Sequence, residues 1–106
     1  MRRRRGKAVD IMALQAFRDS LLGTDPPGNL ALSGFWWDAK GNWPRAHESA
    51  QQDEGPAGSW VHAYLHRKQG DQSNAQYWYG RAGKSFSTVS LDEEWAEIAE
   101  SLLREI

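Results

Sequence analysis

The stretch from Gly58 to Lys84 constrains the fold more than any other part of this 106-residue chain. Apolar and aromatic residues recur in it at spacings of three or four on both sides of Gly70-Asp71. Such spacing places side chains on one helical face, so the stretch predicts two helices, each with one buried stripe. Gly70 can end the first helix in the left-handed conformation, and Asp71 can accept hydrogen bonds from free N–H groups of the second. We therefore expect a tight helical hairpin over residues 57–83.

The same pattern occurs once more upstream, around Gly41-Asn42. Ala46 follows this upstream turn by the same number of positions as Ala75 follows the downstream one, and the two turns are 29 residues apart. In paired helices a small residue allows close approach, aromatic residues fill the remaining space, and one hairpin alone cannot bury both of its faces. We therefore expect a second hairpin over residues 29–54, stacked on the first.

The downstream hairpin ends in Trp78-Tyr79-Gly80-Arg81-Ala82, after alanines at positions 63 and 75. This pattern resembles a tetratricopeptide repeat, especially the Sel-like variety with its W-Y-x-x-A ending. The upstream hairpin matches in part, because Ala50 and Asp53 stand where Tyr79 and Ala82 stand downstream. The resemblance covers residues 29–83, and it implies a scaffold of antiparallel helical hairpins that binds a protein or peptide partner.

The remaining chain predicts an all-α fold of about six helices in one domain, residues 8–106. In the first helix, residues 8–22, the expected buried face consists of Ile11, Leu14, Phe17 and Leu21. The next helix is expected to begin after Asn29, with a buried stripe of Leu30, Ser33, Gly34 and Trp37. Three more helices are expected near residues 44–53, 57–68 and 72–82.

The last helix is predicted over residues 91–106. Ser90 and Glu93 fit a capping box, in which the Ser hydroxyl accepts from a backbone N–H three residues on and the Glu side chain reaches back. The apolar stripe of this helix consists of Trp95, Ile98, Leu102 and Ile106. An amphipathic helix of this kind can cover an open end of a repeat stack, so we expect a C-terminal capping helix.

Composition excludes several classes of protein. The chain contains no cysteine, which rules out disulfides, thiolate metal sites and a cysteine nucleophile, and which favours a cytoplasmic location. No apolar stretch approaches the ~18 residues of a membrane span. The net charge of the chain is −1. Four arginines, Arg2–Arg5, lie within residues 1–7, and we interpret this segment as a disordered basic leader. Only that leader favours nucleic acid, so we do not expect a nucleic-acid partner.

Three histidines and one glutamate form the candidate metal site. His62 and His66 are four residues apart, so on a helix they share one face and can approach one metal. His47 and Glu48 lie on the preceding helix, which is expected to pack against them. Gln51 stands where a His-Glu-x-x-His zinc protease has its second ligand, which excludes that class. The competing interpretation, which we favour, is a polar network between helices without any cofactor.

Five residues form a candidate partner-binding surface, namely Tyr64, Arg67, Tyr77, Trp78 and Arg81. A basic aromatic patch of this kind can hold an acidic peptide. The alternative is that the cations only complement the carbonyl ends of their helices.

The sequence contains no phosphate-binding loop, dinucleotide fingerprint or nucleophile elbow, and it specifies no reaction. The favoured hypothesis is a non-catalytic, tetratricopeptide-like scaffold for a protein or peptide partner. The alternative is a metal-binding protein or metal-dependent enzyme centred on His47, His62 and His66.

Overall fold

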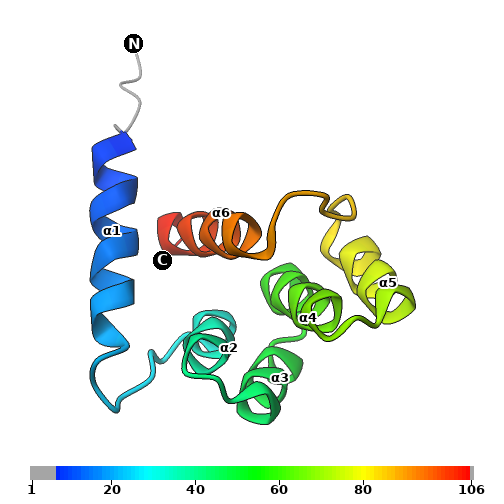
Figure 1. Ribbon diagram of the computed structural model, residues 1–106, viewed down its shortest axis with the longest axis horizontal. Helices are drawn as coiled ribbons and strands as arrows, with labels where there is room; N and C mark the ends of the chain where they lie inside the picture. The colour runs from blue at the N-terminus through cyan, green and yellow to red at the C-terminus, as the bar shows by residue number, and fades with distance from the viewer. Residues whose placement is uncertain (1–6, 106) are drawn as a thin grey trace.

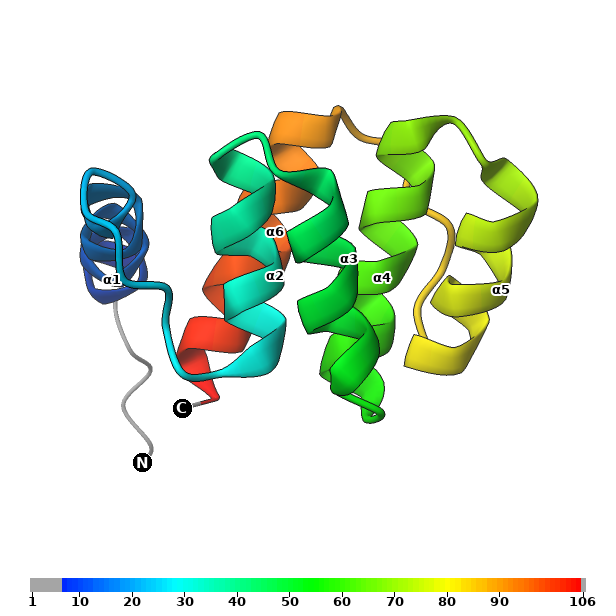
Figure 2. The ribbon, with the colours of Figure 1, turned by 90° about the horizontal axis from the view of Figure 1, so that it is seen from below.

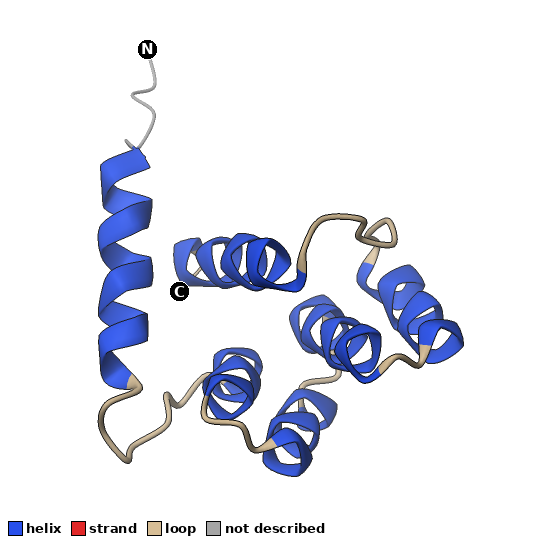
Figure 3. Cartoon of the chain, viewed as in Figure 1, coloured by secondary structure: helices blue, strands red, loops and turns tan. Residues whose placement is uncertain are grey.

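Six α-helices make up the regular structure of residues 7–105, the part that the computed structural model describes, with side chains described from residue 11 on (Figures 1 and 3). The helices are α1 (Lys7–Ser20), α2 (Leu30–Ala39), α3 (Trp43–Gln52), α4 (Pro56–Gln69), α5 (Gln72–Ala82) and α6 (Leu91–Arg104). The described residues contain no strand. The predicted all-α fold of about six helices is confirmed.

The two hairpin turns have the same backbone hydrogen bonds. Gly41 and Gly70 are both left-handed, with φ of +83° and +91°. In each turn the glycine N–H donates to the carbonyl three residues earlier, and the next N–H donates to the carbonyl five residues earlier. The side chains of Asn42 and Asp71 each accept from the backbone N–H three residues on. The two repeats therefore share the hydrogen bonds that end the first helix of each hairpin and begin the second.

Small residues allow the four central helices to pack closely, in the row that Figure 2 shows from α2 to α5. Gly34 of α2 lies against Val61 of α4 and the carbonyl of Ala46 in α3, and an added Cβ would stand 3.1 Å and 3.2 Å from them. Ala63 and Ala75 are fully buried and pack in one cluster between α4 and α5, as expected.

Helix α6 does not close the free end of the stack, which corrects the predicted role of a capping helix. Its backbone packs against α2, α4 and α1, whereas it meets α5 through a hydrogen bond from Tyr79 (Figure 1). The reason is that α2 and α4 each have a second apolar face. Phe35 stacks on Trp95 of α6 at 5.6 Å between ring centroids, and Ile98 is fully buried in the same core.

Helix α1 crosses the other helices at a steep angle and packs on α6 (Figures 1 and 2). Leu14 and Phe17 are buried as predicted, and Phe17 stacks on Trp95 at 5.7 Å. Ile11, expected on the same buried face, is 55% exposed. Helix α1 packs mainly on α6 and meets α2 only near its C-terminal end, where Trp36 donates to Ser20, so only part of the apolar face is covered.

The buried face of α2 is wider than predicted. Ser33 and Gly34 are buried as expected, but Leu30 is exposed and Trp37 is only half-buried. Phe35 and Trp36, which the predicted stripe omitted, are almost completely buried. The prediction of a single buried stripe was wrong because α2 contacts α3, α4 and α6 on different sides.

Two predictions concern residues at the ends of the chain. The expected basic leader over residues 1–7 lies outside the described residues, apart from Lys7, which begins α1. Ile106, expected in the last apolar stripe, is also outside them. Within the described part of the chain, no helix has both the length and the apolar character needed to cross a bilayer.

Candidate functional site

The structure brings His47, His62 and His66 together between α3 and α4. Each offers a ring nitrogen, and the three nitrogens all lie within 4.8 Å of one another. The Nε2 atoms of His47 and His62 are 2.9 Å apart. His62 and His66 are buried, and His47 is half-buried. The convergence expected from the sequence is therefore present for the three histidines.

Helix geometry explains why the rings meet. His62 and His66 are one turn apart on α4, and their rings stack at 4.9 Å between centroids. On α3, Ala46 and Ala50 are fully buried, which brings that helix close to its neighbours. His47 follows Ala46 on the half-buried side, where its ring lies 4.5 Å from that of His62 at 89°.

Two tryptophans hold the imidazoles from either side. Trp43 of α3 stacks on His47 at 4.9 Å, and its indole N–H donates to the carbonyl of Leu65 at 3.2 Å. Trp78 of α5 stacks on His62 at 3.9 Å, with 16° between the ring planes. Because both rings are packed on a flat partner, their range of orientations is restricted before any ligand binds. The stacking of Trp43 and Trp78 on these imidazoles was not predicted from the sequence.

Burial keeps two of the histidines neutral. The pKa of His62 is lowered to about 4, first because burial disfavours the imidazolium and then because of the charges of His47 and His66. The pKa of His47 is also lowered, by burial and then by the charge of His66. Near pH 7 both rings therefore have a lone pair on one nitrogen, which is the form that binds a metal or accepts a hydrogen bond.

Hydrogen bonds of the cluster are compatible with both interpretations of the site. In the neutral pair His47–His62, one Nε2–H donates to the other Nε2. His66 donates from Nδ1 to the side-chain oxygen of Gln69 at 3.3 Å, which leaves the lone pair on its Nε2. An orienting hydrogen bond of this kind is typical of metal-binding histidines, but the cluster also satisfies part of its polar groups internally.

Glu48 is not part of the cluster, which corrects the fourth predicted ligand. It is exposed on α3, and the group of converging ligand atoms contains the three histidines alone. Adjacent residues on an α-helix point about 100° apart, so Glu48 cannot share the direction of His47.

The five predicted partner-binding residues do not form one surface. Tyr64 is buried, and its ring packs edge-on against that of Phe35 at 5.1 Å. Arg67 lies in an ion pair on the same side of α4. Tyr77 and Arg81 are exposed on α5 with the half-buried Trp78 between them. The Arg81 guanidinium lies 5.3 Å from the Trp78 ring centroid, so only these three residues form a basic aromatic patch.

A second polar network, which the sequence did not indicate, lies across α4 from the histidines. Glu94 of α6 is 2% exposed and accepts from Arg67 Nη1 at 2.7 Å and from the hydroxyl of Tyr79. The guanidinium of Arg67 also donates to the carbonyl of Val89. Burial and the hydrogen bond to Glu94 raise the pKa of Tyr79 above its usual range.

An ion pair extends this network along α4. Lys68 donates to Asp38 at 2.9 Å, and Asp38 is 5% exposed. The pKa of Tyr64 is raised above its usual range by burial and then by the charges of Asp38 and Glu94. Arg67 and Lys68 therefore link α4 to α6 and α2 through ion pairs, and Tyr64 is buried between these helices.

Comparison with protein-family models, with curated proteins and with solved structures found no match for this chain.

Proposed function

We propose that this protein binds one divalent transition-metal ion through His47, His62 and His66. The observation that supports the proposal is the convergence of three ring nitrogens within 4.8 Å of one another. Three protein ligands with a further position left for water or a substrate are typical of catalytic zinc sites, so a metal-dependent enzyme is an extension of the same proposal.

The distances require only a modest adjustment. Zinc–imidazole bonds of about 2.0–2.1 Å in a tetrahedral site place ligand nitrogens about 3.4 Å apart. The His47–His62 pair, at 2.9 Å, would open by about half an ångström, and a pair near the 4.8 Å limit would close by rather more. Rotation of the side chains can supply both changes.

The ligand type narrows the choice of ion. Imidazole nitrogen suits Zn²⁺, Cu²⁺ and Ni²⁺, whereas Ca²⁺ and Mg²⁺ prefer oxygen ligands. The neutral state of His47 and His62 near pH 7 favours binding, because the metal does not have to displace a proton from the lone pair. Zn²⁺ is therefore the ion to test first.

Calorimetric titration with Zn²⁺ at pH 7.5 tests the proposal. We expect one ion per chain, and about tenfold to hundredfold weaker binding in His62→Ala, because losing one of three ligands removes a direct bond to the metal. Glu48→Gln is the matched control, since it changes an exposed neighbour of His47 and should bind as the wild type does. Absence of binding, or equal binding by His62→Ala, would leave the polar network as the function of the cluster.

A second candidate function is the binding of an acidic peptide by the three-residue patch of α5. Tyr77 is 56% exposed, and Arg81 donates to its hydroxyl at 3.4 Å while lying over Trp78. This candidate retains the scaffold hypothesis and its cytoplasmic location, which the absence of cysteine favours. In this candidate function the partner contacts α5 and not the five-residue surface predicted from the sequence, because α6 covers one face of α2 and α4.

Fluorescence anisotropy with a labelled poly-glutamate peptide tests this second candidate. Arg81→Glu should abolish binding, because it reverses the charge beside Trp78. Arg45→Glu is a suitable control, since Arg45 also lies over a tryptophan, Trp37, but on a different helix. Equal binding by the wild type and both variants would exclude the patch.

A further inference from the structure

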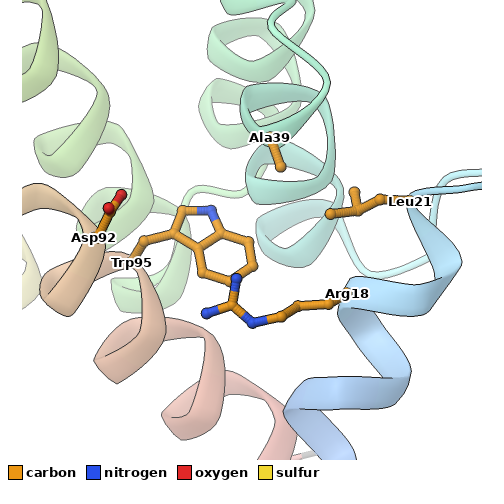
Figure 4. Close-up of a pocket in the computed structure, with 5 residues that line it drawn as sticks. All are labelled: Arg18, Leu21, Ala39, Asp92 and Trp95. Carbon is orange, nitrogen blue, oxygen red and sulfur yellow. The ribbon is translucent and has the colours of Figure 1, made fainter.

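A separate cavity lies between α1, α2 and α6, and Figure 4 shows the residues around it. Its volume is about 290 Å³, and it is lined by Arg18, Leu21, Ala39, Asp92 and Trp95. An apolar cavity of about 150 Å³ already holds benzene in another protein, so this volume is sufficient for a small organic molecule. None of the five residues belongs to the histidine site or to the patch on α5.

The indole nitrogen of Trp95 is the most informative atom in this cavity. Trp95 is 6% exposed, and its Nε1 is the one buried side-chain nitrogen or oxygen without a hydrogen-bond partner among the described side chains, residues 11–105. Leaving such a donor unpaired is costly, so an unpaired donor beside a cavity indicates a ligand with an acceptor atom. Figure 4 shows the nitrogen-bearing edge of the ring turned toward Ala39.

Packing holds the ring of Trp95 in place. Phe17 of α1 and Phe35 of α2 stack on it at 5.7 Å and 5.6 Å between centroids. The indole therefore cannot turn easily to find another acceptor, and its N–H direction is set by the core.

The other residues of the lining determine the charge of that ligand. The Arg18 guanidinium lies 4.7 Å from the centroid of the Trp95 ring on an exposed side chain, so it can follow a bound anion. A guanidinium and a neutral N–H donor together suit one carboxylate. Leu21 and Ala39 offer an apolar surface for a short carbon chain, and a second carboxylate at the end of that chain would lose its hydration there without gaining a partner.

We propose that this cavity binds a small monocarboxylate. The carboxylate accepts hydrogen bonds from Trp95 Nε1 and from Arg18, and the carbon chain packs on Leu21 and Ala39. The apolar surface of Leu21 and Ala39 discriminates against dicarboxylates of the same length, because a second carboxylate there has no partner. This inference is independent of the metal proposal, since it involves different residues and different helices.

Titration with butyrate, followed by the indole ¹H–¹⁵N resonances, tests the proposal. The six tryptophans give six indole signals, and Trp95→Phe identifies the signal of Trp95 because it removes the N–H and retains an aromatic ring. We expect the Trp95 indole proton to move downfield on addition of butyrate, as it gains a charged acceptor. Succinate should bind at least about tenfold more weakly, because its second carboxylate would lie against the apolar surface of Leu21 and Ala39 without a hydrogen-bond partner.

Substitutions separate a built site from weak surface binding. Arg18→Leu should weaken butyrate binding by about tenfold or more, because it removes a charge-assisted hydrogen bond. Arg45→Leu is the matched control and should have no effect, since Arg45 lies at the same 4.7 Å over the ring of Trp37.

Three outcomes would overturn the proposal. One is an unchanged Trp95 signal at high butyrate concentration. Another is an equal response in the wild type and in Arg18→Leu, which would mean an adventitious additive only. The third is a Trp95 signal that is already downfield and shows a cross-peak to a long-lived water, because a bound water would then satisfy the indole N–H.

Discussion

Helix α4 separates two buried polar regions in which ionisable side chains are accommodated differently. On one side, Glu94 is surrounded by groups of opposite or complementary character, the guanidinium of Arg67 and the hydroxyl of Tyr79. On the other, three imidazoles face one another, and no carboxylate joins them among the described residues. The first region is complete within the protein, whereas the second brings three ring nitrogens within 4.8 Å of one another.

The chemistry of the groups explains the difference. A carboxylate that is 2% exposed has to be paired, because burying an uncompensated charge is very unfavourable. Histidine can lose its charge near neutral pH, so burial lowers its pKa and does not require an opposite charge. We infer that the Glu94 region orients α6 and that the histidine region is available for a ligand.

Removing the carboxylate of the Glu94 region should have the largest effect on stability. Glu94→Ala leaves Arg67 and the Tyr79 hydroxyl without their partner, and we expect a loss of about 3 kcal/mol or more in the free energy of unfolding. Glu97→Ala, an exposed glutamate on the same helix, is the control and should cost less than about 0.5 kcal/mol. Urea denaturation measures both. Similar values for the two variants would mean that the network does not hold α6.

Acidic pH should reduce the contribution of the histidine region to the stability of the fold over a defined pH range. The pKa of His62 is about 4 in the folded protein and about 6.5 in the unfolded chain, so the unfolded state binds more protons between these values. Stability from this group is therefore complete above pH 6.5 and is lost as pH falls toward 4, by about 2 kcal/mol between pH 7 and pH 5.

Denaturation in chelator-containing buffer, with His62→Ala as the reference, isolates this contribution from the acidic residues. The wild type should lose more stability than the variant over that pH range. Parallel curves for the two proteins would show that His62 titrates alike in the folded and unfolded states, and that the region is not buried as described.

Removing the Trp78 ring that covers His62 should have the smallest effect on stability. Trp78 stacks on its ring at 3.9 Å, so Trp78→Leu should cost about 1 kcal/mol in stability and raise the pKa of His62 from about 4 toward 6.5. Tyr77→Leu, at the exposed neighbouring position, should leave that pKa unchanged. Titration of the imidazole proton resonances measures both variants. An unchanged pKa in Trp78→Leu would mean that the stacking does not desolvate His62.

The hairpins were predictable from the sequence because their signals are local. Gly70 and Asp71 carry the turn in two residues, and the helix periodicity on either side placed His62 and His66 on one face. His47 followed from the internal repeat, which set how the preceding helix lies. Glu48 was wrongly included because it is adjacent in sequence, whereas a helix directs adjacent side chains differently.

The rest depended on contacts between distant parts of the chain. A stripe on α6 showed that the helix is amphipathic, but not that Phe35 of α2 and the apolar face of α4 would receive it. The Glu94–Arg67 pair spans 27 positions, and no spacing rule connects its members. The indole of Trp95 was assigned to the core, which is correct for its ring, but its unpaired nitrogen becomes visible only when its surroundings are known.

A crystal structure grown with Zn²⁺, with anomalous data collected at the zinc edge, tests the central claim most directly. Three nitrogen ligands predict an anomalous peak between α3 and α4, about 2.0–2.2 Å from a ring nitrogen of each of His47, His62 and His66. A structure without a peak there, in which His47 and His62 still hydrogen-bond each other at 2.9 Å, would contradict it and identify the cluster as a structural network.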